Sequence, residues 1–185
     1  MAEILLISGR PGVGKTTLIR RLAEALGEQA GGFYTEEIRG PEGRLGFRLI
    51  TLEGKEATFA HVDLARRVPY RVGRYGVDVS VLDHIGVEAI LRAVHENQVI
   101  LVDEIGKMEL YSTRFRQVLE DIARGWKPLV ATITKAHHPW AEAFKRQPTA
   151  TLWEITVTNR DLLLEKVIDW LRQREVVPKG HPFPP

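Results

Sequence analysis

The 185-residue sequence contains no cysteine. This absence excludes disulfide bonds, thiolate zinc sites and cysteine nucleophiles, so any metal must be held by oxygen or histidine ligands. Long apolar runs are missing too, since no stretch approaches the ~20 residues of a membrane-spanning helix. Residues 1–8 are a short apolar run with an acid in front, and they lack the basic start of a signal peptide. We therefore expect a cytoplasmic protein without a membrane partner.

The sequence also lacks a strong charge of either sign. Lys and Arg number 26 against 24 Asp and Glu, and the basic residues form no long run, which argues against a nucleic-acid partner. The oligomeric state stays open. At 44% hydrophobic residues the chain can bury one sizeable core, because domains usually run about 100–200 residues. We expect one domain over residues 1–177 and a loose, proline-containing tail over 178–185.

Apolar runs and helical patterns alternate along the chain. The apolar runs predict strands at 3–8, 99–102, 129–134 and 152–158. Residues spaced three or four apart predict helices at 15–26, 81–94, 114–123, 140–145 and 160–174. Two β-prone runs, 32–39 and 46–52, flank a turn and predict a hairpin, whereas 57–76 suggests only a short strand near Phe59 and a loop at 73–76. The pattern predicts a three-layer α/β fold, with a mainly parallel central sheet flanked by helices and an inserted antiparallel hairpin.

Residues 9–16 match the complete phosphate-loop pattern, in which four residues separate a first glycine from Gly-Lys-Thr. A predicted strand precedes the loop and a predicted helix follows it, as the motif requires. We expect nucleotide contacts from the loop and the first helical turn, namely Gly9, Arg10, Pro11, Gly12, Val13, Gly14, Lys15, Thr16 and Thr17.

The chemistry of a phosphate ligand explains these residue types. Glycines let backbone N–H groups turn toward the phosphate oxygens, and the helix N-terminus adds the positive end of its dipole. We predict that Lys15 bridges the outer phosphates and that Thr16 gives its hydroxyl to Mg²⁺. The alternative is a glycine-rich turn that binds no ligand, which a complete motif makes less common.

Asp103 and Glu104 follow four apolar residues at the predicted end of a parallel strand, where side chains reach a ligand-binding crevice. In phosphate-loop proteins an Asp in this position holds the Mg²⁺ shell, so Thr16 and Asp103 are the predicted metal ligands. A carboxylate next to it is suited to orient water for in-line attack on the γ-phosphate. We predict that Glu104 and Lys15 are catalytic. The alternative is that the two acids only begin a turn.

Three segments, in order, carry a resemblance to a known family: the phosphate loop, Gly-Phe-Tyr-Thr-Glu-Glu at 32–37, and Asp-Glu-Ile-Gly-Lys-Met-Glu-Leu at 103–110. They resemble the small nucleoside-triphosphatase family related to the cancer-related nucleoside-triphosphatase. Shorter similarities reach residues 159–160. The resemblance implies a sheet like that of RecA and AAA proteins, and hydrolysis of several nucleoside triphosphates to diphosphate and phosphate. It also implies that one strand lines the nucleotide with Val99, Ile100, Leu101, Val102, Asp103, Glu104, Ile105 and Gly106.

Asn159 and Arg160 open the last predicted helix and could approach the base, with the guanidinium lying over its ring. Asn159 would serve equally well as the helix N-cap. Lys107 could contact phosphate or be a solvated charge. Arg74 could supply an internal counter-charge for the transition state.

Other polar residues carry weaker hypotheses. Thr132 and Thr134 could border the site, although Thr also simply suits strands. Strand alternation places Glu36 and Glu37 on opposite faces, so at most one points toward the site. Because His137 and His138 are adjacent, they are poorly placed to share a metal, and we expect both at the surface.

The leading hypothesis is a magnesium-dependent nucleoside triphosphatase that accepts ATP, GTP and other nucleoside triphosphates. A small phosphate-loop kinase would also need an acceptor pocket and usually an Arg-rich lid, which the sequence does not show. A third hypothesis is a nucleotide-dependent switch or adaptor, in which slow hydrolysis resets a binding state. Phosphate release without an acceptor separates the first from the second, and partner-stimulated turnover favours the third.

Overall fold

The computed structural model, in which residues 2–178 are described, is built on one mixed sheet. Its strands are β1 (Ile4–Ser8), β2 (Ala30–Gly40), β3 (Gly43–Thr51), β4 (Glu56–His61), β5 (Tyr70–Val72), β6 (Tyr75–Val77), β7 (Val99–Ile105), β8 (Leu129–Ile133) and β9 (Ala150–Glu154). Its helices are α1 (Lys15–Leu26), α2 (Val79–Val81), α3 (Val87–Glu96), α4 (Thr113–Arg124), α5 (Pro139–Lys145) and α6 (Arg160–Arg172). The strand order is β5-β6-β4-β3-β2-β7-β8-β1-β9.

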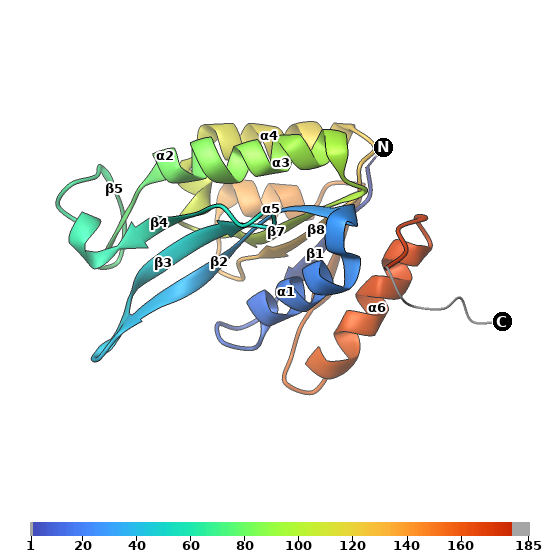
Figure 1. Cartoon of the computed structure of the whole chain (residues 1–185), viewed down its shortest axis with the longest axis horizontal. Coiled ribbons are helices and arrows are strands. Elements are labelled where there is room, and N and C mark those ends of the chain that lie inside the picture. Colours follow the sequence, from blue (N-terminus) through green and yellow to red (C-terminus); the bar gives the residue numbers. More distant parts are fainter. Residues whose placement is uncertain (1, 179–185) are drawn as a thin grey trace.

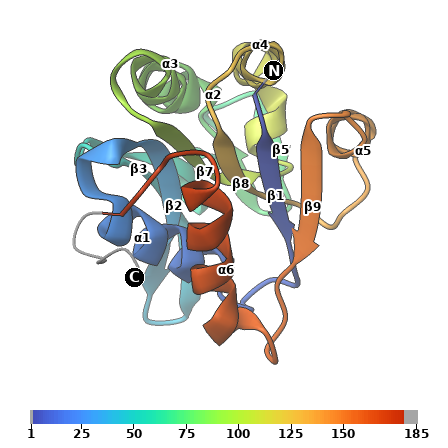
Figure 2. The same cartoon turned by 90° about the vertical axis from the view of Figure 1, so that its right-hand side faces the viewer.

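Helices cover both faces of the parallel part of the sheet, which consists of β2, β7, β8, β1 and β9. Helices α1 and α6 lie on one face, and α3, α4 and α5 lie on the other (Figure 1 and Figure 2). In β1, Ile4 and Leu6 belong to one apolar core while Leu5 and Ile7 belong to the second. Because side chains alternate between the faces of a strand, a strand buried on both faces is apolar throughout. The predicted three-layer α/β fold is confirmed.

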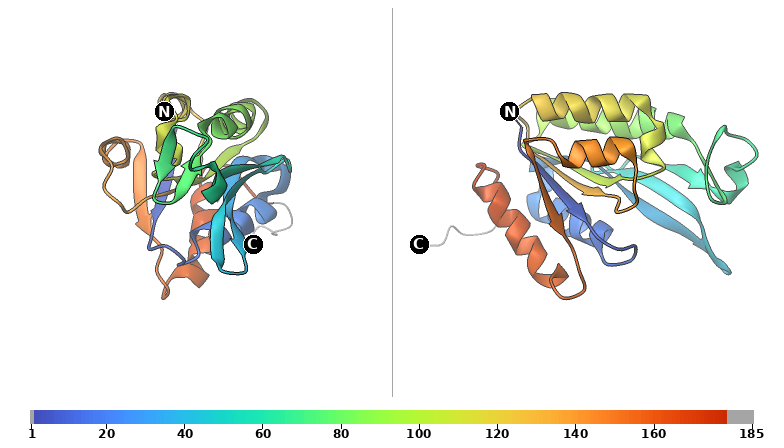
Figure 3. Two further views of the ribbon diagram at one scale, coloured as in Figure 1. Left: turned by 90° about the vertical axis from the view of Figure 1, so that its left-hand side faces the viewer. Right: turned by 180° about the vertical axis from the view of Figure 1, so that it is seen from behind.

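The antiparallel part is larger than the predicted hairpin. Strands β3, β4, β6 and β5 continue the sheet from β2 in antiparallel pairings. This extension projects beyond the ends of the parallel strands, as its cyan to green ribbons show in Figure 3. The loop predicted at 73–76 is wrong in its second half, because Tyr75 and Gly76 belong to β6 and pair with Val72 and Arg71.

Most element boundaries agree with the predicted ones to within two residues. The helix expected at 81–94 is longer, because a π-helical turn at Leu82–Gly86 joins α2 to α3. Strand β9 ends at Glu154, four residues before the predicted end, because the Asn159 side chain bonds to the Glu154 carbonyl and the Thr156 amide and so fixes a turn. The predicted tail falls mostly on residues outside the described part of the chain.

Among residues 2–178, no helix has both the length and the apolar character that crossing a bilayer requires. Strands β1, β7 and β8 run parallel, so their carboxyl ends meet at one edge of the sheet. The segments that follow these strands, including the phosphate loop and the acidic pair, are therefore brought together there.

Candidate active site

Residues 9–14 form the loop between β1 and α1. Gly12 and Gly14 have φ angles of 76° and 113°, in the left-handed region that glycine adopts without strain. Gly14 is the N-cap of α1, and no side chain caps that helix, so the amides of its first turn remain available to an anion. Lys15 Nζ donates hydrogen bonds to the carbonyl oxygens of Gly9 (2.8 Å) and Arg10 (3.2 Å). The loop thus presents N–H groups and an ammonium in one place.

Asp103 lies near the carboxyl end of β7 and is 2% exposed. Its Oδ2 accepts a 2.7 Å hydrogen bond from Thr16 Oγ1, and its Oδ1 accepts a 2.6 Å hydrogen bond from Thr132 Oγ1. Burial raises the pKa of Asp103, whereas the hydrogen bonds from Thr132 and Thr16 and the Thr35 amide lower it. The structure therefore brings the two predicted metal ligands, Thr16 and Asp103, into direct contact.

The acidic pair sits on a β-bulge. Val102 pairs with Ala131 and Ile105 with Ile133, so β7 has one more residue than β8 over this stretch. A bulge interrupts strand alternation and re-aims the side chains on it. β7 therefore continues past Val102, and both acids lie within the strand rather than after it.

Glu104 is half-buried, and its pKa is affected by two charged neighbours, the acid Asp103 and the base Lys15. Burial and the charge of Asp103 raise the pKa of Glu104, while the charge of Lys15 lowers it. Lys15 has the same effect on Asp103, so the ammonium lies close to both carboxyls. The phosphate loop and the acidic pair thus form one cluster.

Glu109 is an acid of this cluster that sequence reasoning did not single out. It begins a short 3-10 turn at Glu109–Tyr111 and is 5% exposed. Burial raises the pKa of Glu109 well above its usual range, the charges of Glu104 and Asp103 raise it further, and the amides of Glu109 and Gly106 oppose them. The hint in the sequence is an acid placed between the apolar residues Met108 and Leu110.

The strand residues before the acidic pair belong to the core. Val99, Ile100, Leu101 and Val102 are all 0% exposed. Ile100 and Val102 pack in the core under α3 and α4, and Val99 and Leu101 pack in the core under α1 and α6. These side chains hold β7 in place, which differs from the nucleotide-lining role that the resemblance implies. Ile105 is likewise fully buried.

The start of α6 lies beside the phosphate loop. A Cβ placed on Gly14 would lie 3.9 Å from Arg160 Cδ. The Asn159 side chain accepts a hydrogen bond from the Thr156 amide and donates one to the Glu154 carbonyl, both at 2.8 Å. Asn159 occupies the N-cap position of α6, as one of the two alternatives expected, but its side chain makes no cap bond to the helix and is committed to the preceding turn.

The candidates on β2 and on the antiparallel extension have other partners. Glu36 forms ion pairs with Arg20 (3.0 Å) and Arg48 (3.8 Å). Glu37 pairs with Arg39 and Arg44, at 2.5 and 2.9 Å. Arg74 donates to the Arg44 carbonyl, and its guanidinium lies over the Tyr75 ring. Apart from the ion pair of Glu36 with Arg20 of α1, the contacts of all three candidates thus lie within β2 and the extension.

The remaining candidates divide between support and surface. Thr132 bonds to Asp103, a role that strand preference alone did not predict. The Thr134 hydroxyl accepts a 3.1 Å hydrogen bond from the Ala136 amide and supports the turn after β8. Lys107 is exposed and borders a cavity of about 320 Å³ together with Arg71 and His138. His137 is exposed.

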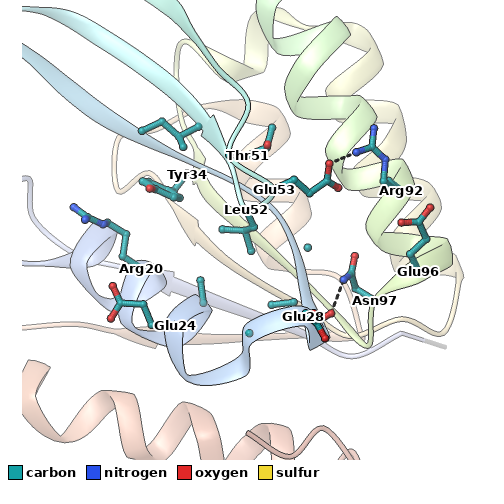
Figure 4. Close-up of a pocket in the computed structure, with 16 residues that line it drawn as sticks. Arg20, Glu24, Glu28, Tyr34, Thr51, Leu52, Glu53, Arg92, Glu96 and Asn97 are labelled. Atoms are coloured by element: carbon teal, nitrogen blue, oxygen red, sulfur yellow. Dashed lines mark hydrogen bonds and ion pairs between the residues drawn. The ribbon is translucent and has the colours of Figure 1, made fainter. Parts of the chain in front are cut away.

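A larger cavity, of about 790 Å³, lies at the opposite end of α1 (Figure 4). It is bordered by the end of α1, the start of β2, the turn after β3 and α3. The guanidinium of Arg92 pairs with Glu53 across it, and the Asn97 amide donates to the Glu28 carbonyl. Because the start of β2 lies at the amino edge of the parallel strands, this cavity is separate from the phosphate loop. Cavity size alone does not mark the site.

Comparison with known proteins gives matches along most of the chain. The model of the NTPase family matches residues 4–168. Nucleoside-triphosphatase THEP1 of Thermotoga maritima is 48% identical over 168 residues, which cover 91% of this chain and 95% of that protein.

Two solved structures extend the comparison to the fold. The crystal structure of THEP1 from the hyperthermophile Aquifex aeolicus has a TM-score of 0.83 and 40% identity, and the match covers 91% of this chain and 98% of that one. The solution structure of a human cancer-related nucleoside triphosphatase has a TM-score of 0.75 and 30% identity, with 93% and 98% covered. The similarity therefore spans whole chains and is not confined to the loop motif.

Proposed function

The chain belongs to the NTPase family, and from that premise we propose that it hydrolyses nucleoside triphosphates to the diphosphate and orthophosphate. The observation that carries this proposal is the 2.7 Å hydrogen bond between Thr16, the last residue of the phosphate-loop motif, and Asp103, which precedes Glu104. That contact places the phosphate-binding loop beside the acidic pair, in which Glu104 is the carboxylate proposed to accept a proton. We further propose that the reaction depends on Mg²⁺ and tolerates many bases.

The binding role falls to groups that recognise phosphate. The uncapped amides of α1 and the loop amides around Gly12 and Gly14 donate to phosphate oxygens, and the helix dipole favours their negative charge. Lys15 adds a full positive charge, which stabilises the charge that develops on the outer phosphate as its bond breaks.

The oxygen donors at Thr16 and Asp103 fit Mg²⁺. Within the described part of the chain, no group of three or more acidic or histidine side chains could enclose an ion. Mg²⁺ suits this limited donor set, because it usually takes one or two carboxylates and completes its shell with water and substrate phosphates. Thr16 and Asp103 would hold it, and when bound it would neutralise phosphate charge. Thr132 fixes the orientation of the Asp103 carboxyl.

Glu104 is the proposed base. Its carboxyl orients the attacking water and accepts the proton that the water loses. Burial and the charge of Asp103 raise the pKa of Glu104 toward the pH of the reaction, which increases its strength as a base. Lys15 lies near enough to keep the carboxylate form accessible.

Broad base tolerance follows from what the loop recognises. The contacts from residues 9–16 address phosphates, which all nucleoside triphosphates share. Arg160, beside Gly14, offers a guanidinium plane that stacks on any aromatic ring without reading its hydrogen-bonding edge. We propose no base-selective contact.

The test is a phosphate-release assay with ATP, GTP, CTP and UTP, with and without Mg²⁺, on the parent and Glu104→Gln. We expect phosphate release from all four nucleotides in Mg²⁺ without an added acceptor, and nucleotide binding without turnover in the variant. Strict dependence on an acceptor would instead support a kinase. Turnover by Glu104→Gln at the parent rate would remove Glu104 from the mechanism.

A further inference from the structure

The carboxyl groups of Glu109 and Glu104 both lie close to the α-carbon of Gly106. A Cβ placed on Gly106 would lie 2.7 Å from Glu104 Oε1 and 2.9 Å from Glu109 Oε2. The two carboxyls therefore approach each other across the glycine, which leaves room for them because it has no side chain. We infer that Glu109 is a positioning residue for the proposed hydrolysis, which holds the carboxyl of Glu104 in its reactive orientation.

The turn that begins at Glu109 is closed by backbone hydrogen bonds. Its backbone is fixed by the hydrogen bond from the Leu110 amide to the Gly106 carbonyl and by that from the Ser112 amide to the Glu109 carbonyl, both at 3.0 Å. The Glu109 carboxyl instead faces the amides of Gly106 and of Glu109 itself. In addition to these backbone bonds, the Glu109 carboxyl thus ties its own residue to Gly106, two residues after Glu104.

Burial of the Glu109 carboxyl lowers the stability of the fold. Glu109 is 5% exposed and has the negative charges of Glu104 and Asp103 as neighbours, while the described residues give it no ion-pair partner. A buried acid without a cation is less favourable than an apolar residue of similar volume. Its presence beside the base is therefore explained by what it does to Glu104 and not by fold stability.

A matched pair of substitutions separates positioning from packing. Glu109→Met and Glu109→Gln have nearly the same size, but only the glutamine keeps a polar end that can accept from the Gly106 amide and contact Glu104. Glu165→Met, on the exposed face of α6, controls for the loss of one negative charge. Each full-length protein is measured for kcat, KM for ATP, and thermal unfolding.

We expect Glu109→Met to unfold at or above the parent temperature, to keep the parent KM, and to lose kcat by about ten- to hundredfold, as a small misplacement of a reacting group does. Glu109→Gln should recover most of that loss, and Glu165→Met should match the parent. Parent kcat in the methionine variant would overturn the inference. So would equal losses in the methionine and glutamine variants, because the amide retains the positioning contact.

Measuring Glu104→Gln alongside these variants distinguishes this inference from the proposed function on which it rests. If Glu104→Gln loses turnover while Glu109→Met keeps it, hydrolysis through Glu104 stands and the role of Glu109 fails. If the parent releases no phosphate at all, the proposed function fails first. A raised KM at parent kcat in Glu109→Met would place Glu109 in nucleotide binding and also overturn the inference.

Discussion

The substitution Gly106→Ala tests whether the base must lie where the structure places it. An added Cβ would meet Glu104 Oε1 at 2.7 Å, whereas ordinary contact begins at 3.4 Å, so this oxygen must move by about 0.7 Å. Because misplacing a reacting group by ~1 Å can cost ~10²-fold in rate, kcat should fall about ten- to hundredfold. KM should stay at the parent value, since the phosphate loop is unchanged.

Stability should respond differently from rate in this variant. The atoms that the new Cβ meets are side-chain atoms, namely one carboxyl oxygen each of Glu104 and Glu109 and the Cγ of Glu104, and no backbone atom is among them. A change from glycine to alanine also reduces the entropy of the unfolded chain, by ~0.4–1 kcal/mol where the backbone allows it, and Gly106 is not among the glycines with positive φ. We therefore expect the free energy of unfolding to change by less than ~1 kcal/mol.

The assay is steady-state phosphate release with ATP and Mg²⁺, alongside urea denaturation of the same preparations. Gly125→Ala is the control, because a Cβ there meets only backbone atoms, the nearest at 3.3 Å, directly after α4. A Gly106→Ala protein that is folded and turns over at the parent rate would refute the claim that the position of Glu104 limits the reaction.

Three further predictions concern charge, metal and nucleotide. Burial raises the pKa of Glu109 in the folded protein, so the free energy of unfolding of the parent falls as pH rises above 4.5, by up to ~1.4 kcal/mol per pH unit. Urea denaturation should therefore show Glu109→Gln more stable than the parent at pH 8, with a smaller difference at pH 5. Equal differences at the two pH values would contradict this. Thr132→Val removes a 2.6 Å hydrogen bond to Asp103 and should raise the Mg²⁺ concentration for half-maximal activity about tenfold or more. An unchanged Mg²⁺ titration would show that Thr132 does not support the metal site. Lys15→Ala should abolish binding of a fluorescent nucleoside triphosphate in equilibrium titrations while Lys166→Ala binds as the parent does, and binding by both would exclude the loop as the phosphate site.

The elements around the phosphate loop could be predicted from sequence because their local signals agree with their tertiary environment. Strand β1 is apolar on both faces, Gly14 permits the left-handed N-cap, and the helix pattern of α1 ends at Gly27. The antiparallel extension was less predictable, because β5 and β6 are three residues each and their pairing depends on tertiary contacts that periodicity does not reveal.

The sequence predicts the site residues that belong to a recognisable motif, but not those whose place in the site depends on burial in the folded protein. Nothing local indicates that Thr132 bonds to Asp103, and the apolar neighbours of Glu109 are only a weak hint that it lies buried beside Glu104. An acid is usually taken as exposed, and only the folded arrangement of β7 and the turn after it reverses that expectation. Asn159 shows the converse case, since its strong capping preference is overridden by a tighter turn before α6.

In the proposed reaction, the half-buried Glu104 beside the phosphate loop orients the water that cleaves the terminal anhydride. Single-turnover release of orthophosphate from Mg·ATP, followed in parallel with nucleotide occupancy on the parent and on Glu104→Gln, measures this directly. We expect equal nucleotide occupancy in both proteins and orthophosphate release from the parent alone. Equal release rates at equal occupancy would contradict this expectation.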